Sequence, residues 1–414
     1  MGNNYGNINY NLSTLNNLNQ DKEYYKNNNL TNKFYVYNKE TFNIIKYIKN
    51  KITDENCSNL GMFRSVILKN NELKVFSPPK SINIYKFIKN NNFDDLIVDE
   101  FIEGTMINMF WNENKWEIAT KSSVGGNVSF FKLDKTIFAR KENTFRYMFE
   151  DIIKYYDKNL DISNFIDSNN KNLDNKEIKS CVFSFVMQHP SNRIVVPFDE
   201  PKIYLVAIYK IDNFSVTRIN ISNEFKNKLP DFIKYPKIYN NFNNMNELIH
   251  KFECCDYKTV GVMITNKNTF ERTKIRNKNY ENVKLLRGNQ PKLQYRYLML
   301  RQTKQIKEYL NYYPEQQHYF DKFKNQVHQF TKQLYDEYVN CFIARNVLFK
   351  ECKYNLKLHI SELHNIYKYY IKNSVDYRMR KITFNIVKDY VNNLPPAKVM
   401  YSINYDFYNN KNKQ

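Results

Sequence analysis

The chain has 414 residues, of which 42% are hydrophobic, and a formal net charge of +21 at neutral pH. This length is sufficient for two or three domains with a sizeable core. No apolar run approaches the roughly 18 residues of a membrane-spanning helix, and no charged-then-apolar leader opens the chain. We therefore expect neither a membrane span nor secretion.

The excess of positive charge favours a polyanionic partner. There are 63 Lys and Arg residues against 42 Asp and Glu residues, and such chains commonly meet nucleic acid through phosphate contacts. Codon bias is the alternative source of this charge, because AT-rich coding sequences favour lysine. The cysteines form no CxxC pair, which predicts reduced thiols in an intracellular, cytoplasmic protein. They are Cys57, Cys181, Cys254, Cys255, Cys341 and Cys352.

The first part of the chain predicts a low-complexity start followed by strands. Residues 1–32 are mostly Asn, Tyr, Leu and Gly and are expected to form a flexible tail. Residues 39–52 carry apolar side chains at helical spacing and predict a helix. Short, nearly alternating apolar runs over residues 62–132 predict strands of a mixed or antiparallel sheet. A helix is expected over 143–160 and a polar loop over 167–177.

The rest of the chain predicts more strands and then a change to helices. CVFSFVMQHP and IYLVAIYKI predict strands, EFKNKLPDFIKYP and NMNELIHKFEC two short helices, and TVGVMITN and RTKIRN the last strands. Further on, Pro314 separates two expected helices, and Pro395 with Pro396 ends the last one. We expect an α+β fold, with mixed and antiparallel sheets and flanking helices over 33–285 and a basic all-α domain over 286–414.

The segment VDEFIEGTMINMFW, residues 98–111, is the most informative part of the chain. Its FIEGT resembles the nucleotide-attachment motif of the T-even phage type of single-strand RNA ligase, in the covalent nucleotidyltransferase superfamily. Related proteins of large DNA viruses share this motif. There a lysine stands three residues before a glycine, with an acidic residue between them. Here Glu103 and Gly104 are present, but Phe101 occupies the lysine position, and a phenyl ring cannot attack a phosphate.

Other segments resemble the same family in the same order across residues 62–287. MFRSVIL places Arg64 on the strand before the attachment motif, and WEIATKSSVGG places Lys121 in the next motif. FSFVMQHPSNRIVVPF resembles the family's FEFV…NRIV segment and contains Arg193, while TKIRN matches the closing KxK motif at Lys274 and Arg276. The resemblance implies a ligase-like nucleotidyltransferase fold with a helical C-terminal domain.

Two further departures from the family accompany Phe101. Ser184 in FSFV and Val260 in TVGVMI stand where the family has glutamates that help to hold nucleotide and metal. Without these carboxylates Mg²⁺ loses hard oxygen ligands, so we expect no metal site. Lys80 and Lys121 are the candidates for a displaced nucleophile. ATP and Mg²⁺ would be cofactors only if a displaced lysine restored ligase activity, and no other cofactor is expected.

The resemblance implies a nucleotide- or phosphate-binding set that faces one cleft, consisting of Arg64, Glu103, Gly104, Lys121, Arg193, Lys274 and Arg276. Two simpler roles stay open, because Arg193 can close its own turn and Arg276 can pair with an acid. Trp111 and Trp116 flank the turn NENK and either stack on a base or pack on cross-strand neighbours, the second being the more common role.

Three functions are compatible with these patterns. The favoured one is a degenerate RNA-ligase-like protein of a large DNA virus, found in the host cytoplasm or the virion, that binds RNA or nucleotide phosphates non-covalently. The first alternative is an active ATP-dependent RNA ligase that uses a displaced lysine. The second is a structural or virion-associated protein on the same scaffold. The expected partner is nucleic acid, RNA rather than DNA, with an acidic protein as a further partner for the helical domain.

Overall fold

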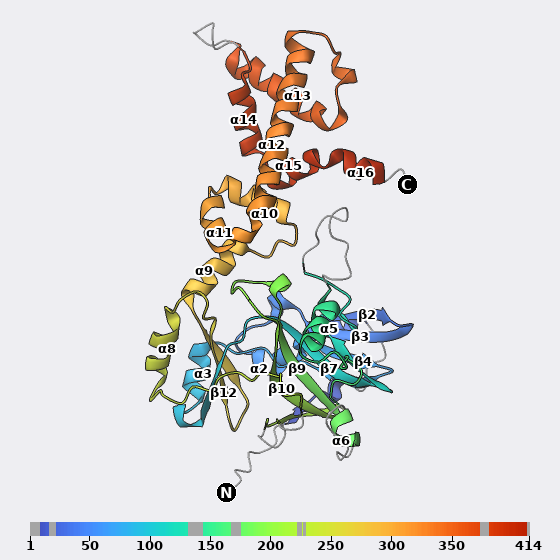
Figure 1. Cartoon of the computed structure of the whole chain (residues 1–414), viewed down its shortest axis with the longest axis vertical. Coiled ribbons are helices and arrows are strands. Elements are labelled where there is room, and N and C mark those ends of the chain that lie inside the picture. Colours follow the sequence, from blue (N-terminus) through green and yellow to red (C-terminus); the bar gives the residue numbers. More distant parts are fainter. Residues whose placement is uncertain are drawn as a thin grey trace. The chain divides into compact units, whose positions relative to one another are not determined.

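The computed structural model describes residues 9–15, 22–130, 144–166, 175–221, 226, 229–372 and 381–411 (Figure 1). The chain divides into two compact units, the first ending at Leu285 and the second beginning at Leu286. The first contains antiparallel sheets with helices and the second contains helices, which confirms the predicted α+β class. In the parts of the chain that the structure describes, every helix is too short or too polar to cross a membrane.

The largest sheet of the first unit has six strands in the order β1-β11-β10-β9-β7-β8. Every neighbouring pair is antiparallel. The strands are β1 (Asn9–Asn11), β7 (Thr105–Asn112), β8 (Lys115–Ala119), β9 (Cys181–Gln188), β10 (Lys202–Asp212) and β11 (Ser215–Ile219). The strands predicted from TMINMFW and KWEIATKS, within residues 62–132, and from CVFSFVMQHP and IYLVAIYKI are therefore confirmed.

Two smaller antiparallel sheets complete the first unit. One has the order β2-β3-β4-β5, formed by β2 (Leu30–Tyr37), β3 (Glu40–Tyr47), β4 (Val66–Lys69) and β5 (Glu72–Phe76). The other has the order β13-β12-β6, formed by β6 (Leu96–Glu100), β12 (Gly261–Asn266) and β13 (Arg272–Arg276). This three-stranded sheet joins the segment before Phe101 to the TVGVMI and TKIRN segments.

The prediction of a helix over residues 39–52 is wrong, because this segment forms β3 and a short 3₁₀ turn, Lys49–Lys51. Phe42 and Ile44 are buried, whereas Thr41 before them and Asn43 between them are more exposed, which is the two-residue period of a strand. A short apolar run fits both periods. The segment forms a strand because its backbone pairs with β2 on one side and with β4 on the other.

Part of the segment expected to be a flexible tail belongs to the fold. Strand β1 pairs with β11, and α1 (Lys22–Asn27) precedes β2. Leu12, Leu15, Tyr25 and Leu30 are all at most 4% exposed and pack in one hydrophobic cluster. Low sequence complexity therefore did not prevent these side chains from reaching the core. Residues 1–8 and 16–21 of the expected tail lie outside the described part of the chain.

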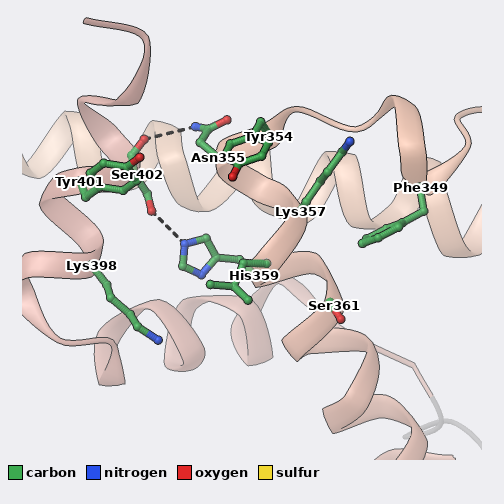
Figure 2. A pocket seen from close by; sticks show the side chains of 10 residues that line it. Phe349, Tyr354, Asn355, Lys357, His359, Ser361, Lys398, Tyr401 and Ser402 are labelled. Carbon is green, nitrogen blue, oxygen red and sulfur yellow. Dashed lines mark hydrogen bonds between the residues drawn. The ribbon is translucent and has the colours of Figure 1, made fainter. Parts of the chain in front are cut away.

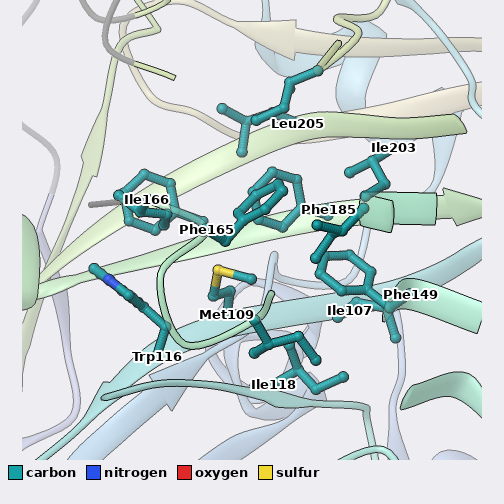
Figure 3. Close-up of a cluster of buried hydrophobic side chains, with 14 of the residues drawn as sticks. Ile107, Met109, Trp116, Ile118, Phe149, Phe165, Ile166, Phe185, Ile203 and Leu205 are labelled. Atoms are coloured by element: carbon teal, nitrogen blue, oxygen red, sulfur yellow. The ribbon is translucent and has the colours of Figure 1, made fainter. Parts of the chain in front are cut away.

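A large hydrophobic core lies between the six-stranded sheet and α5, Phe145–Tyr156 (Figure 3). This helix confirms the prediction for residues 143–160. It begins at Thr144, whose side chain accepts a hydrogen bond from the Tyr147 backbone N–H, and it buries Met148, Phe149, Ile152 and Ile153 along one face.

The two tryptophans form a cross-strand pair in the hairpin of β7 and β8. Trp111 lies opposite Trp116, and their ring centres are 5.4 Å apart. Trp116 is 1% exposed and belongs to the core beneath α5. Packing is thus its role in the structure, so Trp116 cannot stack on a base without unfolding of the hairpin.

Short helices flank the sheets: α2 (Cys57–Leu60), α3 (Ile84–Asn90), α6 (Asn175–Lys179), α8 (Met245–Glu253) and α9 (Lys278–Arg287). Helix α8 confirms one of the two predicted short helices, whereas residues 229–236 of the other are not helical. Lys234 there exchanges backbone hydrogen bonds with Ile203 and Leu205 of β10, and Pro230 and Pro236 disfavour a helix. Residues 224, 225, 227 and 228 of that segment lie outside the described chain, as do residues 167–174 of the expected polar loop.

The second unit is helical where the structure describes it. Its helices are α10 (Leu293–Gln302), α11 (Ile306–Tyr312), α12 (Gln317–Tyr338), α13 (Tyr354–Ile366), α14 (Phe384–Asn393), α15 (Pro396–Ile403) and α16 (Tyr405–Lys411). Pro314 lies between α11 and α12, as predicted. The expectation that Pro395 and Pro396 end the last helix is wrong, since α15 begins at Pro396. Proline fits the first turn of a helix, where its missing N–H has no partner to lose.

Candidate functional site

The loop between β6 and β7 places Phe101 beside the three-stranded sheet. The Phe101 backbone N–H donates to the Gly261 carbonyl oxygen at 3.1 Å, and Gly261 lies opposite Arg276 in the register of β12 and β13. The Arg276 guanidinium carbon is 5.3 Å from the centre of the Phe101 ring, which is a cation–π distance. Phe101, which the resemblance places in the position of the attachment lysine, thus packs against an arginine and offers no amine.

Glu103 holds a neighbouring loop. Its carboxylate is 5% exposed and accepts hydrogen bonds from the backbone N–H groups of Val195 at 2.8 Å and Val196 at 3.1 Å. Burial raises the pKa of Glu103, and the opposing influences are these N–H groups and a hydrogen bond from Tyr280. The sequence predicts a nucleotide contact at Glu103. In the structure its carboxylate positions the loop that follows β9, and the nucleotide contact stays a prediction.

Gly104 allows β7 to lie close against β9. Its φ is +150°, and a Cβ at this position would lie 2.4 Å from the Met187 carbonyl oxygen. Both the backbone conformation and this approach therefore require glycine. Gly104 has a structural reason to be present that does not depend on a bound nucleotide.

Substitution of Gly104 by alanine is expected to lower the free energy of unfolding of the first unit by at least about 2 kcal/mol, because the new Cβ overlaps the backbone of β9. Urea unfolding monitored by tryptophan fluorescence measures the unfolding of the first unit, because this unit contains both tryptophans of the chain. The matched control is Gly61→Ala, at a helical φ of −64° and with its nearest atom at 3.3 Å. Equal losses in the two variants would contradict the role assigned to Gly104.

Strand β13 carries a row of cations on one face. Arg272, Lys274 and Arg276 alternate with Thr273 and Ile275, and alternate residues of a strand point to the same face. Thr273 and Ile275 are buried on the opposite face, where Ile275 packs in a hydrophobic cluster. The buried face fixes the orientation of the strand and so determines where the three cations point.

Residues distant in sequence add to this row and form what we call the basic cluster: Arg64, Lys80, Arg272, Lys274 and Arg276. Burial lowers the pKa of Lys274 to about 8, and the positive charges of Arg276, Arg64, Lys80 and Arg272 lower it further in the same direction. Burial likewise lowers the pKa of Arg272 to about 10, with a further contribution from Arg64. Like charges are held together here at an electrostatic cost that a bound anion would remove.

Carbonyl groups of the loop that follows β5, residues 77–80 with the sequence SPPK, help to hold the arginines of the basic cluster. Arg272 donates from Nη2 to the Pro79 carbonyl oxygen, and Arg64 from Nη1 to the Pro78 carbonyl oxygen at 3.5 Å. Arg276 makes an ion pair with Glu281 at the start of α9, with 2.7 Å between Nη1 and Oε1. The alternative that Arg276 pairs with an acid is therefore observed. The pair neutralises one cation of the cluster.

Lys121 lies near Arg64 on the turn that follows β8. Burial lowers the pKa of Lys121, followed by the charges of Arg64, Lys46 and Lys49. Its Nζ atom is 5.4 Å from the centre of the Tyr47 ring, and its carbonyl oxygen accepts a hydrogen bond from the Ser65 hydroxyl at 3.2 Å. The link to Ser65 ties the turn to the residue next to Arg64.

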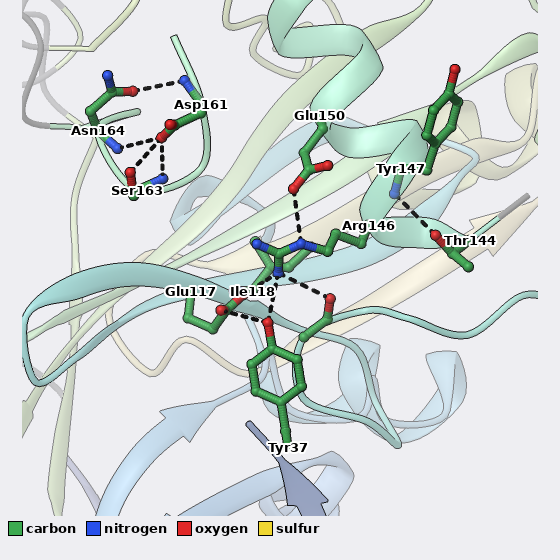
Figure 4. Close-up of polar contacts among 11 residues, drawn as sticks. Tyr37, Glu117, Ile118, Thr144, Arg146, Tyr147, Glu150, Asp161, Ser163 and Asn164 are labelled. Carbon is green, nitrogen blue, oxygen red and sulfur yellow. Dashed lines mark hydrogen bonds and ion pairs between the residues drawn. The ribbon is translucent and has the colours of Figure 1, made fainter. Parts of the chain in front are cut away.

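A buried ion pair fixes the far end of the same turn (Figure 4). Arg146, at the start of α5, donates from Nη1 to Glu117 Oε1 at 2.6 Å, to the Tyr37 hydroxyl at 3.1 Å and to the Gly125 carbonyl oxygen at 3.3 Å. The Tyr37 hydroxyl donates to the other oxygen of Glu117 at 2.9 Å. Glu117 is 1% exposed. This network anchors both ends of the segment from β8 to Gly125 and so holds the backbone that carries Lys121.

The structure brings together four of the five cations that the resemblance places in one cleft. The charges of Arg64 and Arg276 act on Lys274, and the charge of Arg64 also acts on Lys121. Arg193 differs, because its Nε atom donates to the Val195 carbonyl oxygen at 2.9 Å, the turn-closing contact that the sequence left open as its simpler role. Arg193 therefore lies in the same loop that Glu103 holds.

The two positions where the family has glutamates are neutral and buried. The Ser184 hydroxyl donates to the Asn108 side-chain oxygen at 2.8 Å, and the Asn108 amide donates to the Ser77 hydroxyl at 2.7 Å. Val260 is 6% exposed. Neither position offers a carboxylate to a divalent ion, and among the described residues no group of three or more His, Cys, Asp or Glu side chains could hold a metal. Ser184 and Val260 therefore supply no hard oxygen ligand of the kind that Mg²⁺ prefers.

Sequence reasoning missed several groups near the basic cluster. Arg272 could have been predicted from the sequence, because it continues the two-residue period of Lys274 and Arg276. Lys284 of α9 had none, although the charge of Arg276 acts on it. Asp99 lies opposite Met263, which itself lies opposite Lys274, and burial raises the pKa of Asp99 to about 6. Such groups become visible only once the strand register is known.

Comparisons with known proteins give a limited similarity. No family model matches the chain. A segment of 114 residues is 29% identical to an RNA ligase of Rhodothermus phage RM378, and it covers 27% of this chain and 23% of that protein. The matched segment is thus less than a quarter of the length of this relative.

Among solved structures, an archaeal ATP-dependent RNA ligase is 12% identical, covering 72% of this chain and 70% of the other, with a TM-score of 0.37. A mutant Naegleria gruberi RNA ligase with ATP and Mn is 11% identical, covering 64% and 83%, with a TM-score of 0.33. Both TM-scores are too low to assign a shared fold. The site is therefore interpreted from its own residues.

Proposed function

We propose that the chain is an RNA-ligase-like protein that binds RNA through its phosphates at the basic cluster, without forming a covalent nucleotidyl intermediate. The observation that carries this proposal is the environment of Lys274, whose pKa of about 8 reflects burial among four other cations. A polyanion stabilises such an arrangement because each phosphate replaces repulsion between cations with attraction. Arginine adds two-point hydrogen bonding to phosphate oxygens.

The chemistry of the attachment position supports binding without transfer. Phe101 has no lone pair with which to attack phosphorus, and Ser184 and Val260 supply no carboxylate for a metal. RNA is the proposed nucleic acid because the relative matched over 114 residues is a phage RNA ligase. We further propose a T-even phage-type ancestry in a large DNA virus, with the protein acting in the host cytoplasm or the virion.

An active RNA ligase with a displaced lysine is the second candidate. Lys121 favours it, since burial lowers the pKa of this lysine near Arg64, and an unprotonated amine is what a nucleophile requires. Lys80 is the other candidate, and its Nζ atom lies 3.7 Å from Cys57 Sγ. The absence of carboxylates at residues 184 and 260 weighs against both lysines, because the phosphates of ATP would lack their metal.

Incubation with ATP labelled at the α-phosphate, with Mg²⁺ or Mn²⁺, separates the two candidates. We expect no label on the protein after denaturation, whereas single-stranded RNA binds with an affinity that falls steeply with salt. Covalent label that disappears in Lys121→Ala or Lys80→Ala would establish the ligase instead. Weak RNA binding with no salt dependence would count against both and favour a structural protein.

The charge state of Lys274 predicts a pH dependence of RNA binding. A phosphate beside Lys274 favours the protonated amine and raises its pKa from about 8 toward the usual 10.5. The contribution of Lys274 is therefore complete below pH 8 and is lost as the pH rises through this window. Affinity for oligoadenylate, whose bases do not titrate there, should fall by up to about tenfold per pH unit above 8. Lys274→Gln should flatten the profile, and an unchanged profile in this variant would contradict the assignment.

A further inference from the structure

The second unit contains a cavity of about 570 Å³ between α13 and α15. Figure 2 shows the side chains that line it. Its lining includes two lysines and three aromatic rings, with no carboxylate among the residues that line it. A volume of this size is typical of sites for small ligands.

Two tyrosines at this cavity expose large aromatic surfaces. Tyr354 is 72% exposed and Tyr401 is 53% exposed. Both lie next to Tyr405, with ring centres 5.6 Å and 5.9 Å from it, so the three rings support one another. A planar ligand that stacks on these rings would bury apolar surface that water now covers.

The two lysines supply positive charge beside the rings. The Lys357 Nζ atom donates to the Lys350 carbonyl oxygen at 2.7 Å, which holds the amine in place through a neutral partner. Lys398 lies 3.9 Å from Glu362, an exposed and loose pair that phosphate can replace at little cost. The cavity thus combines a surface for stacking with cations for an anionic group.

Hydrogen bonds keep the floor of the cavity rigid. His359 is 3% exposed, and its two ring nitrogens lie 2.7 Å from the Tyr390 hydroxyl and 2.8 Å from the Ser402 hydroxyl. The Asn355 amide donates to the Ser402 carbonyl oxygen at 3.2 Å. The floor therefore ties α13 to α14 and α15, and it fixes the distance between the helices that carry Tyr354 and Tyr401.

We propose that this cavity binds a nucleotide of single-stranded nucleic acid, with the base stacked on Tyr354 and Tyr401 and the phosphates beside Lys357 and Lys398. Aromatic stacking next to cations is the physical basis of single-strand binding without sequence preference. The site lies in the second unit and does not depend on the basic cluster of the first.

The test uses the full chain and oligoadenylate in RNA and DNA form. The Tyr354→Ala, Tyr401→Ala double variant is expected to bind the RNA roughly tenfold more weakly or worse, with an unchanged salt slope, because stacking is lost and no cation is removed. The Tyr354→Phe, Tyr401→Phe variant keeps the rings and should bind as the parent protein does. Tyr369→Ala, at an exposed tyrosine of the same unit that does not line the cavity, controls for general loss of aromatic surface.

The outcomes separate this site from the basic cluster. Loss of affinity in the double alanine variant, with binding by the phenylalanine variant, supports the cavity site, and equal loss for RNA and DNA identifies base stacking as the shared chemistry. Unchanged affinity in the double alanine variant overturns this proposal while leaving the basic cluster in place. Photo-crosslinking of iodouridine-containing RNA supplies a second readout, and crosslinks confined to the first unit also overturn it. Because both tyrosines are exposed, the variants should keep the unfolding curve of the parent protein.

Discussion

Replacement of Arg146 by alanine is expected to destabilise the first unit by about 3–5 kcal/mol, because it leaves the Glu117 carboxylate buried without its cation. Glu117 is 1% exposed, and Arg146 approaches it to 2.6 Å while also holding the Tyr37 hydroxyl and the Gly125 carbonyl oxygen (Figure 4). Urea unfolding followed by the fluorescence of Trp111 and Trp116 measures the effect.

The control for this prediction is Glu150→Ala. Glu150 pairs with the same arginine at 2.8 Å, but on the same helix and with a third of its side chain exposed. Loss of this pair should cost less than about 1 kcal/mol. If the two substitutions proved equally costly, the buried pair would not be the anchor of the turn that carries Lys121. Glu117→Gln in the Arg146→Ala background should recover part of the stability, because it removes the uncompensated charge.

Neutralisation of Arg64, Lys274 and Arg276 by glutamine is expected to weaken binding of single-stranded RNA by at least about 100-fold at moderate salt, since each contributes a charged hydrogen bond to phosphate. The same triple variant should lose little stability, because the Arg276–Glu281 pair that it breaks is about a third exposed and contributes less than about 1 kcal/mol. Burial and mutual repulsion lower the pKa of Lys274 and of Arg64, so the folded state gains from removal of these charges. A loss of affinity with retained stability therefore distinguishes a binding surface from a structural one.

A matched control has the same net charge as this triple variant but keeps the basic cluster intact. Lys158, Lys251 and Lys258 are lysines of the first unit outside the basic cluster, and the triple substitution of these residues by glutamine removes the same three charges. It should reduce RNA affinity only slightly, by the weak effect of net charge. If both triple variants lost affinity equally, the general basicity of the chain would account for binding, as codon bias alone would predict.

The sequence predicted those parts of the fold in which a long pattern permits one interpretation. The apolar runs of the β7 and β9 segments and the helical spacing of α5 each extend over eight or more residues, and each prediction was confirmed. The helix predicted over residues 39–52 is wrong although this segment is as long, because its apolar spacing also fits a helix and the pairing of β3 with β2 and β4 is a tertiary contact. The burial of Leu12 and Leu15 in the expected tail is likewise tertiary.

The candidate site was predictable to the extent that its residues follow strand periodicity or a family motif. Lys274 and Arg276 were found in this way, and Arg272 could have been. That Arg64 and Lys80 act on Lys274 depends on how three sheets are arranged, which no local pattern records. The motif gives the position of the Glu103 carboxylate, but not the backbone N–H group of Val195 that donates to it.

The most direct test of the proposed function is the salt dependence of single-stranded RNA binding by the parent protein and by the Arg64, Lys274 and Arg276 triple glutamine variant. Each cation that contacts a phosphate contributes about 0.7 to the slope of log affinity against log salt for a single strand. We predict that the slope of the triple variant is smaller by about 2, and that neither protein takes up label from ATP labelled at its α-phosphate. An unchanged slope, or covalent label on the parent protein, would contradict non-covalent phosphate binding at the basic cluster.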